Sequence, residues 1–194
     1  MTLGLASICL LLFAYLLGSL SSAIILSRIT GFADPRTAGS NNPGATNVLR
    51  IAGKRAAVLT LLGDFLKGLI AVLLASWAGA DRLLIALAGF SAFLGHCYPL
   101  FFRFKGGKGV ATALATNIAF NWPVGLTMTL IWLLFARVFK ISSLAALVTF
   151  TALPGLIFWQ ESSIAVTLVF TAMSVILIWR HRSNIQRLLQ GVES

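Results

Sequence analysis

The sequence predicts an all-α integral membrane protein, a polytopic helix bundle with about seven transmembrane helices in a single domain, residues 1–194. The first reason is composition: 58% of the residues are hydrophobic and only 10% are charged, which is not typical of a soluble domain of this length. The second reason is the recurrence of apolar runs near the ~20 residues that a helix needs to cross a bilayer. These runs leave no room for a separate soluble domain.

The expected spans follow one another with short polar connections. In order, they cover residues 3–26, residues 56–78, a third run that ends near 100, residues 111–120, a fifth run that ends at 135, residues 144–158 and residues 164–179. The run 111–120 is short for a span. Pro154 predicts a kink in the sixth span. Asp64 and Lys67 are one helical turn apart and can pair within the second span.

The cations set the expected orientation. Arg28 follows the first span and no cation precedes it, so the positive-inside rule places the N-terminus outside and the next loop in the cytoplasm. With seven spans, every Lys and Arg except Arg82 lies on or near the cytoplasmic side, and the C-terminus is cytoplasmic. Topology, anionic lipid headgroups and anionic substrates account for the net charge of +10, so we expect no nucleic-acid partner.

The central loop, residues 34–50 (DPRTAGSNNPGATNVLR), is a polar stretch between two apolar runs. Its Gly, Asn and Pro residues favour turns whose N–H groups can point at an anion, and its two arginines add positive charge. We therefore interpret it as a turn-rich phosphate-binding loop. The alternative is a linker whose basic residues only fix topology, which leaves its Ser, Asn and Thr side chains unexplained. The candidate ligands are Ser40, Asn42, Gly44, Asn47 and Arg50.

A second basic loop, the glycine loop, covers residues 101–109 (FFRFKGGKG) and precedes the run 111–120. Free N–H groups at a helix start and the charge of the lysines both favour an anion there. The loop is not a Walker A motif, because Gly109 follows Lys108 where Ser or Thr is required, so we reject nucleotide hydrolysis. The candidate ligands are Lys105, Gly106, Gly107 and Lys108.

The C-terminal tail, residues 180–194, holds His181 and Asn184 one helical turn apart, and we predict that this pair belongs to a site. The alternative is a basic helix end that caps carbonyls and meets lipid headgroups. His96 is more typical of a hydrogen-bonded structural residue. The five acidic residues are too scattered for a carboxylate pair, and we predict no metal site and no cofactor.

Three segments carry a resemblance to a known family. GSNNPGATNVLR (39–50), LGHCYPLFFRFKGGKGVAT (94–112) and HRSNIQRLLQGVE (181–193) resemble the signature segments of the bacterial acyl-phosphate-dependent glycerol-3-phosphate acyltransferases, the PlsY family. The resemblance covers the whole chain in length and order. Asn41 departs from the family's usual glycine, but Asn tolerates a left-handed backbone better than most residues.

The resemblance implies transfer of a fatty acyl group from acyl phosphate to the 1-hydroxyl of sn-glycerol 3-phosphate. The products would be lysophosphatidic acid and phosphate, in the first step of phospholipid synthesis. It also implies a multi-pass protein of the bacterial cytoplasmic (inner) membrane with its active site facing the cytoplasm. The implied partners are acyl phosphate, glycerol 3-phosphate, membrane lipids and, as a candidate, the enzyme that forms the acyl phosphate.

The same resemblance makes Ser143, His181 and Asn184 the expected catalytic residues. Ser143 and Asn184 would orient phosphate or the developing oxyanion by hydrogen bonds. His181 would either be the general base for the 1-hydroxyl or position a substrate phosphate that takes the proton, and the sequence leaves both open. A membrane transporter for a phosphorylated or anionic solute is the alternative function. It would use similar basic loops, but it should place polar groups near the bilayer midplane, often in two related halves.

Overall fold

The computed structural model describes residues 4–193, and the regular structure of this part of the chain is entirely helical. In chain order, the elements are α1 (Leu5–Gly18), α2 (Ser22–Thr30), α3 (Ala45–Trp77), α4 (Arg82–Cys97), the 3-10 turn η1 (Leu100–Phe102), α5 (Val110–Phe120), α6 (Trp122–Phe139), α7 (Ser142–Glu161), α8 (Ile164–Arg180) and α9 (Arg182–Leu189).

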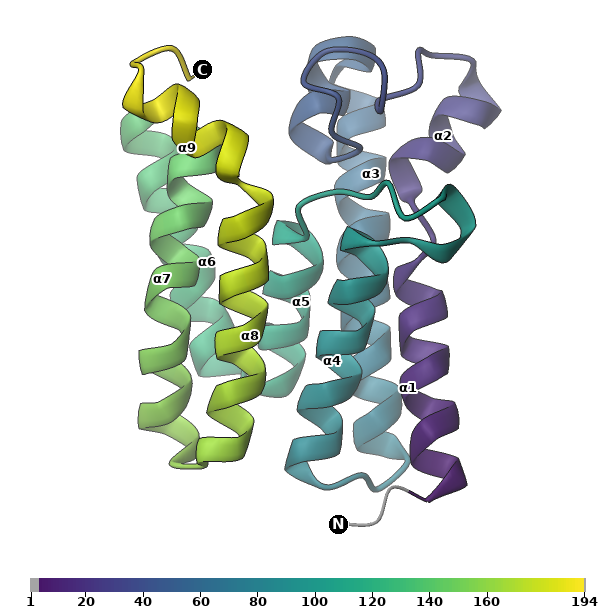
Figure 1. The fold of residues 1–194 in the computed structure, drawn as a ribbon, viewed down its shortest axis with the longest axis vertical. Helices are drawn as coiled ribbons and strands as arrows, with labels where there is room; N and C mark the ends of the chain where they lie inside the picture. Colours follow the sequence, from purple (N-terminus) through teal and green to yellow (C-terminus); the bar gives the residue numbers. More distant parts are fainter. Residues whose placement is uncertain (1–3, 194) are drawn as a thin grey trace.

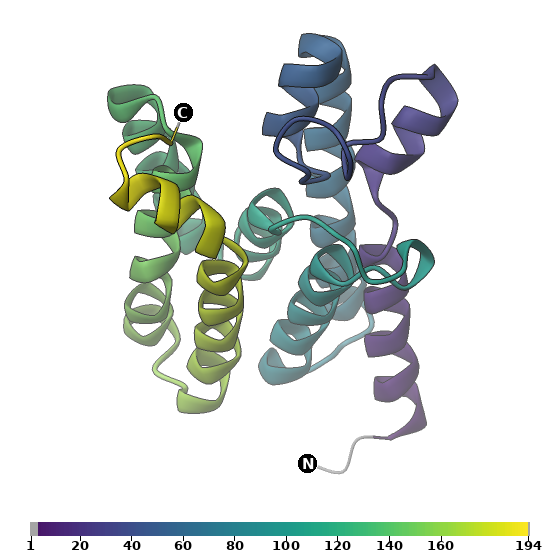
Figure 2. The same cartoon turned by 45° about the horizontal axis from the view of Figure 1, so that its top comes forward.

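Two groups of helices stand side by side with α5 between them (Figure 1). In one group, α1 packs on α4, and α3 packs on both α4 and α5. In the other group, α7 packs against α6 and α8. Contacts of α5 with α6 and of α4 with α8 join the two groups. Figure 2 shows α9 turned away from α8, and the bend between their axes is 57°.

The core lies where the two groups meet. Phe93 of α4, Phe120 of α5, Phe150 of α7 and Phe170 of α8 belong to one buried cluster, in which the rings of Phe120 and Phe170 are 4.9 Å apart. The outer faces of the bundle are apolar too. This is expected in a membrane, because exposing apolar side chains to lipid acyl chains costs no free energy of hydration. On α6 the exposed leucines are Leu126, Leu130, Leu133 and Leu134.

Fewer than seven of the described helices are long enough to be full spans. Within residues 4–193, four elements are able to cross a membrane by length and composition: α3, α4 extended through η1, α6 and α7. The bent pairs α1 with α2 and α8 with α9 raise the number to six at most. The run predicted as the fourth span is α5, whose 11 residues reach only about 16 Å of a hydrocarbon core of about 30 Å.

The first span is not a single helix. α1 and α2 meet at an angle of 43° on either side of residues 19–21, although the hydropathy of this segment is continuous. Gly18 lies so close to α4 that a Cβ on it would be 2.1 Å from the carbonyl oxygen of Ala92. A side chain from α3 takes up the freed carbonyl of Leu20, because Lys67 Nζ donates to it at 2.8 Å. Tertiary contacts therefore stabilise a break that the apolar pattern does not signal.

The central loop is also shorter than predicted, because α3 begins at Ala45 and residues 45–50 are helical. The helix starts after Pro43 and Gly44, and its first turns bury Val48 against Ala23 and Ala57. Gly53 then interrupts the helix with a φ of 79°, a left-handed conformation that suits glycine. The sixth expected span, by contrast, is longer than predicted, because α7 continues through Pro154 to Glu161.

The two ends of the bundle differ in chemistry. α1 begins at the lower end in Figure 1, where Arg82 pairs with Glu161 and lies over the Phe120 ring, 3.9 Å from its centroid. The central loop and the C-terminal tail lie at the upper end. The first described residues and the C-terminal tail therefore lie at opposite ends of the bundle, because the chain runs along it an odd number of times when the short α5 is included. Which end faces the cytoplasm stays a prediction.

Candidate active site

The central loop is held together by Asn47. This side chain is buried, its Oδ1 accepts from the N–H of Ser40 at 2.8 Å, and its Nδ2 donates to the carbonyls of Pro35 and Ala38 at 3.1 and 2.9 Å. Gly39 lies against it with a φ of 62°, and a Cβ there would be 2.2 Å from Asn47 Oδ1. The amide of Asn47 thus shapes the loop, which is a different contribution from the direct phosphate contact that the sequence suggested.

The loop exposes other predicted ligands at its outer surface. Ser40 and Arg50 are exposed, and both line a pocket of about 290 Å³. Asn42 lies beside Gly44, where an added Cβ would be 2.8 Å from Asn42 Nδ2. Asn41 has a φ of 56°, a left-handed conformation that Asn tolerates better than most residues. The turn residues of the central loop therefore have the local conformations that their types predict.

The glycine loop is a tight turn laid against the end of α4. Arg103 and Phe104 have positive φ values of 56° and 58°, and Gly109 has one of 88° just before α5 begins. Gly106 and Gly107 are buried, and a Cβ on Gly106 would be 2.1 Å from the carbonyl oxygen of His96. The two glycines are needed because the backbone runs in direct contact with its neighbour.

Arg180 fixes the glycine loop from the other group of helices. Its guanidinium donates to the carbonyl of Gly106 at 2.7 Å and to the carbonyl of Gly107 at 3.2 Å, and it lies 5.3 Å from the centroid of the Tyr98 ring. Because α8 carries Arg180 in its last turn, the loop and the C-terminal tail are joined at one place. The side chain of Lys105, by contrast, is exposed and makes no hydrogen bond or ion pair with the described residues of this cluster.

Two of the three expected catalytic residues, Ser143 and Asn184, meet at a carboxylate that the sequence analysis did not single out. Glu193 Oε1 accepts from Ser143 Oγ at 2.7 Å and from Asn184 Nδ2, and Glu193 Oε2 accepts from Arg187 Nε. Lys108 Nζ donates to Asn184 Oδ1, which joins the glycine loop to the same cluster. The carboxylate thus lies among the donors and cations that an anionic substrate would use.

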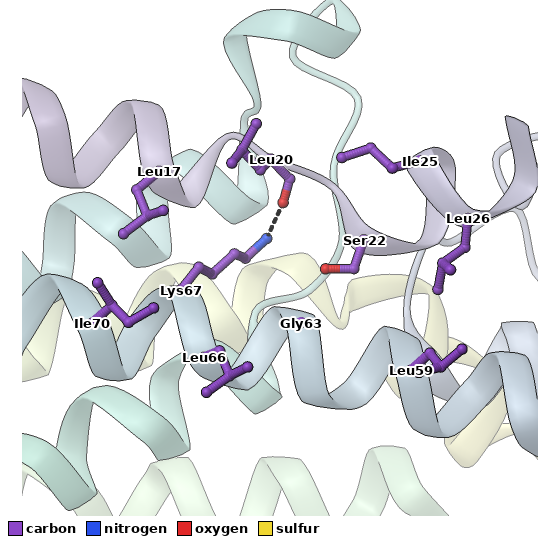
Figure 3. A pocket seen from close by; sticks show the side chains of 10 residues that line it. All are labelled: Leu17, Leu20, Ser22, Ile25, Leu26, Leu59, Gly63, Leu66, Lys67 and Ile70. Carbon is purple, nitrogen blue, oxygen red and sulfur yellow. Dashed lines mark hydrogen bonds between the residues drawn. The ribbon is translucent and has the colours of Figure 1, made fainter. Parts of the chain in front are cut away.

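The pocket of about 290 Å³ joins this cluster to the central loop. Its lining comes from both ends of the sequence: Gly39, Ser40, Arg50, Arg187, Val192 and Glu193. All three signature segments therefore meet at the upper end of the bundle, the central loop and the tail through this pocket, and the glycine loop through Lys108 and Arg180. A larger pocket of about 390 Å³ lies elsewhere, between the α1–α2 break and α3, and its lining is mostly leucine and isoleucine (Figure 3).

Comparison with known proteins identifies the family. The family profile described as glycerol-3-phosphate acyltransferase matches residues 8–191. The chain belongs to the glycerol-3-phosphate acyltransferase family. It is 53% identical over 182 residues to a glycerol-3-phosphate acyltransferase of Methylococcus capsulatus, a match that covers 94% of this chain and 92% of the relative. With the Hydrogenovibrio crunogenus relative the identity is 50% over 181 residues, covering 93% and 87%.

Solved structures of this acyltransferase family share the fold. The chain is similar to the crystal structure of PlsY, an integral membrane glycerol 3-phosphate acyltransferase, in its glycerol 3-phosphate form, with a TM-score of 0.92, 39% identity and coverage of 97% of this chain and 94% of that one. For the lysophosphatidic acid form, the TM-score is 0.87, the identity is 37% and the coverage is again 97% and 94%. The match confirms an all-helical integral membrane enzyme and favours the acyltransferase over the transporter alternative.

The pKa values of charged side chains in the acyltransferase site are shifted by partial burial and by neighbouring charges. Burial lowers the pKa of Lys108 to about 8, with Glu193 opposing the shift and Arg187 and Arg180 adding to it. The carboxyl of Glu193 has a lowered pKa, because the hydrogen bonds from Ser143, Asn184 and Arg187 outweigh the effect of its burial. The site is therefore strongly electropositive, and its one carboxylate is held ionised.

His181 lies just beyond the last residue of α8. Its Nδ1 is 2.8 Å from the carbonyl of Leu177, and since a carbonyl can only accept, Nδ1 carries the proton and Nε2 is the acceptor nitrogen of the neutral ring. Burial, with the charges of Lys108 and Arg180, lowers the pKa of His181 to about 4, although the bond to Leu177 opposes the shift. His181 is thus neutral at pH 7 before substrate binds.

Sequence reasoning missed two parts of this site. Glu193 was one acidic residue among five scattered ones, and its distance of 50 residues from Ser143 hid the contact. Its place in the third signature segment was the available signal. The sequence analysis did not single out Arg180, and its position in the last turn of α8, before His181, was the available signal for a loop contact. Among the described residues, no group of three His, Cys, Asp or Glu side chains lies close enough to hold a metal ion.

Proposed function

We propose that this acyltransferase uses acyl phosphate as its donor and transfers the acyl group to the 1-hydroxyl of sn-glycerol 3-phosphate in one direct step. The observation that carries the proposal is the electropositive cluster around Lys108, Asn184 and Ser143, which already surrounds the carboxylate of Glu193. Two phosphate-bearing substrates repel each other, so a site that binds both needs several cations and N–H or O–H donors in one place.

The proposed step needs few catalytic groups, because an acyl phosphate is already activated. The oxygen of the 1-hydroxyl attacks the carbonyl carbon and forms the ester bond. The bond from that carbon to the phosphate oxygen breaks, and its electron pair leaves with the phosphate. No acyl-enzyme is formed on this route, and Ser143 is proposed to donate a hydrogen bond to phosphate or the oxyanion, not to act as a nucleophile.

His181 is the proposed acceptor of the hydroxyl proton. The contact of its Nδ1 with Leu177 supports this, because it leaves Nε2 as the basic nitrogen. With a pKa of about 4, His181 is a weak base, but two bound phosphate groups would raise this pKa towards neutrality. The phosphate of glycerol 3-phosphate, with a second pKa of ~6, is the competing acceptor.

The remaining ligands divide between direct contact and support. Ser40, Arg50 and Lys108 are proposed to contact phosphate, because they lie at or beside the pocket at the upper end of the bundle. Asn47 is proposed to act through the shape of the central loop. Asn42, Gly44, Lys105, Gly106 and Gly107 remain predicted ligands by their place in the two loops.

The location proposed for this site is the cytoplasmic face of a bacterial inner membrane. Support comes from the cations, since the central loop and the C-terminal tail, which carry Arg36, Arg50 and Arg187, lie at the upper end of the bundle, while α4 begins with Arg82 at the lower end. Acyl phosphate would reach the site with its chain in the membrane. The enzyme that forms it is therefore a proposed neighbour.

The test uses the purified protein in phospholipid vesicles. A long-chain acyl phosphate with radiolabelled glycerol 3-phosphate should give labelled lysophosphatidic acid, and the corresponding acyl-coenzyme A should not replace the acyl phosphate. Product from the thioester with none from acyl phosphate would contradict the proposed donor.

A further inference from the structure

Three ionisable side chains are buried together beneath the glycine loop, apart from the residues discussed so far as the site. Asp64 and Lys67 come from α3 and His96 from α4, and their exposed fractions are only 2%, 4% and 6%. Lys67 Nζ is 3.0 Å from Asp64 Oδ1, and His96 Nδ1 is 3.6 Å from the same oxygen. Burying charged groups costs free energy even when they are paired, so a cluster of this kind calls for a reason other than stability alone.

The cluster is tied into the surrounding backbone on two sides. Lys67 Nζ also donates to the carbonyl of Leu20 at the α1–α2 break, as Figure 3 shows. Thr112 Oγ1 of α5 donates to the carbonyl of Asp64 at 2.8 Å. The position of Asp64 is therefore set by α3, by the broken first span and by the helix that follows the glycine loop.

His96 connects this cluster to the glycine loop. Its backbone carbonyl accepts from the N–H of Gly107 at 3.2 Å. Its ring lies directly against the same glycine, since a Cβ on Gly107 would be 2.2 Å from Nε2 and 2.9 Å from Cε1. The imidazole is thus the surface on which Gly107 rests, while Arg180 holds the two glycine carbonyls from the other side.

We propose that His96, oriented by Asp64 and Lys67, is a positioning residue that sets the path of Gly107 and thereby the shape of the substrate-binding turn. The inference rests on the proposed function of the glycine loop in binding substrate phosphate. His96 acts through Gly107 and does not touch substrate. Its Nδ1 faces Asp64 Oδ1 at 3.6 Å, a contact longer than a hydrogen bond, and the charge of Asp64 is balanced by Lys67 at 3.0 Å.

The proposal predicts a specific genetic interaction between His96 and Gly107. In the native protein, Gly107→Ala forces the new methyl group into the imidazole, so KM for a phosphate substrate should rise by at least about tenfold. In a His96→Ala background, the ring is gone, and the same change should raise KM less than about threefold relative to His96→Ala alone. His96→Ala alone should raise KM more than it lowers kcat.

Gly106→Ala is the matched control. A Cβ at Gly106 would be 2.1 Å from the backbone oxygen of His96 and 2.7 Å from that of Cys97, and His96→Ala leaves both oxygens in place. The harm done by Gly106→Ala should therefore be the same in both backgrounds. His96→Gln, whose flexible side chain can bend away from the loop, is a second background in which Gly107→Ala should be tolerated.

The measurements are KM and kcat for both substrates, with monodispersity and thermal unfolding of each purified variant. If Gly107→Ala has no effect in the native background, the glycine loop is not a substrate site and the proposed function is wrong on that point. If Gly107→Ala is equally harmful in all backgrounds, the loop remains a site and the role of His96 is refuted. Loss of folding in both His96 variants would also refute it, because the bundle and not the loop would then depend on the ring.

Discussion

Replacing Asn47 by Ala tests whether the central loop owes its shape to one buried amide. The change removes three hydrogen bonds, to the N–H of Ser40 and to the carbonyls of Pro35 and Ala38. Each is worth about 1 kcal/mol net. If the loss of about 3 kcal/mol falls entirely on the ordered loop, kcat/KM should fall by about 100-fold, since each 1.4 kcal/mol is a factor of ten.

Hydrogen exchange separates this indirect role from direct phosphate binding. Without substrate, the amide of Ser40 should exchange faster in Asn47→Ala than in the native protein, because its acceptor is lost. Asn47→Asp should be nearly as harmful, because its second carboxylate oxygen would face the carbonyls of Pro35 and Ala38. Thr46→Ala is the control, since Thr46 is the exposed neighbour.

Two results would refute this reasoning. Native kinetics in Asn47→Ala would show that the loop does not depend on the amide or does not belong to the site. Lost activity with unchanged Ser40 exchange would instead return Asn47 to the direct phosphate contact that the sequence first suggested.

Three further predictions follow from the same structure. Because the pKa of Lys108 is lowered to about 8, its positive charge is present at pH 7 and is lost as the pH rises through 8, so KM should rise above about pH 8. Lys108→Arg should remove this rise, whereas a pH profile of KM that is the same in Lys108→Arg and the native protein would exclude Lys108 as the titrating group. His181→Asn keeps a hydrogen bond but cannot take a proton, so kcat should fall by roughly 10²–10⁴; near-native turnover would make the substrate phosphate the acceptor. Arg82→Ala removes the contacts with Glu161 and Phe120 at the lower end of the bundle, so it should cost roughly 1–2 kcal/mol of stability in thermal unfolding. KM should stay unchanged, and a changed KM would contradict the conclusion that these contacts are independent of the site at the upper end.

Patterns that depend on local chemistry were predictable from the sequence. The glycine and asparagine content of the central loop indicated turns, and Gly39 and Asn41 have the left-handed backbone that such turns use. The spacing of His181 and Asn184 placed them at the same end of the last helices, and Asn184 indeed contacts the predicted lysine, Lys108. The apolar runs located the helices, because side-chain hydropathy is sufficient to identify segments that lie in lipid.

Features that depend on tertiary contact were not predictable. The break after Gly18 requires the approach of Ala92 and the reach of Lys67 from α3, and neither leaves a trace in the hydropathy of residues 3–26. α5 begins only after the buried glycines of the glycine loop, a start that the hydropathy of the ten-residue run 111–120 does not signal. Glu193 acquires its role only when the tail folds back onto Ser143.

The central claim is that acyl transfer is direct, from bound acyl phosphate to glycerol 3-phosphate. The most direct measurement incubates the purified enzyme with acyl-labelled acyl phosphate alone, quenches it and counts the label that remains on the protein. The account predicts no covalent label, and then, after glycerol 3-phosphate is added, equal amounts of lysophosphatidic acid and phosphate. A stoichiometric label on Ser40, Ser143 or Cys97 that is chased into lysophosphatidic acid would contradict it.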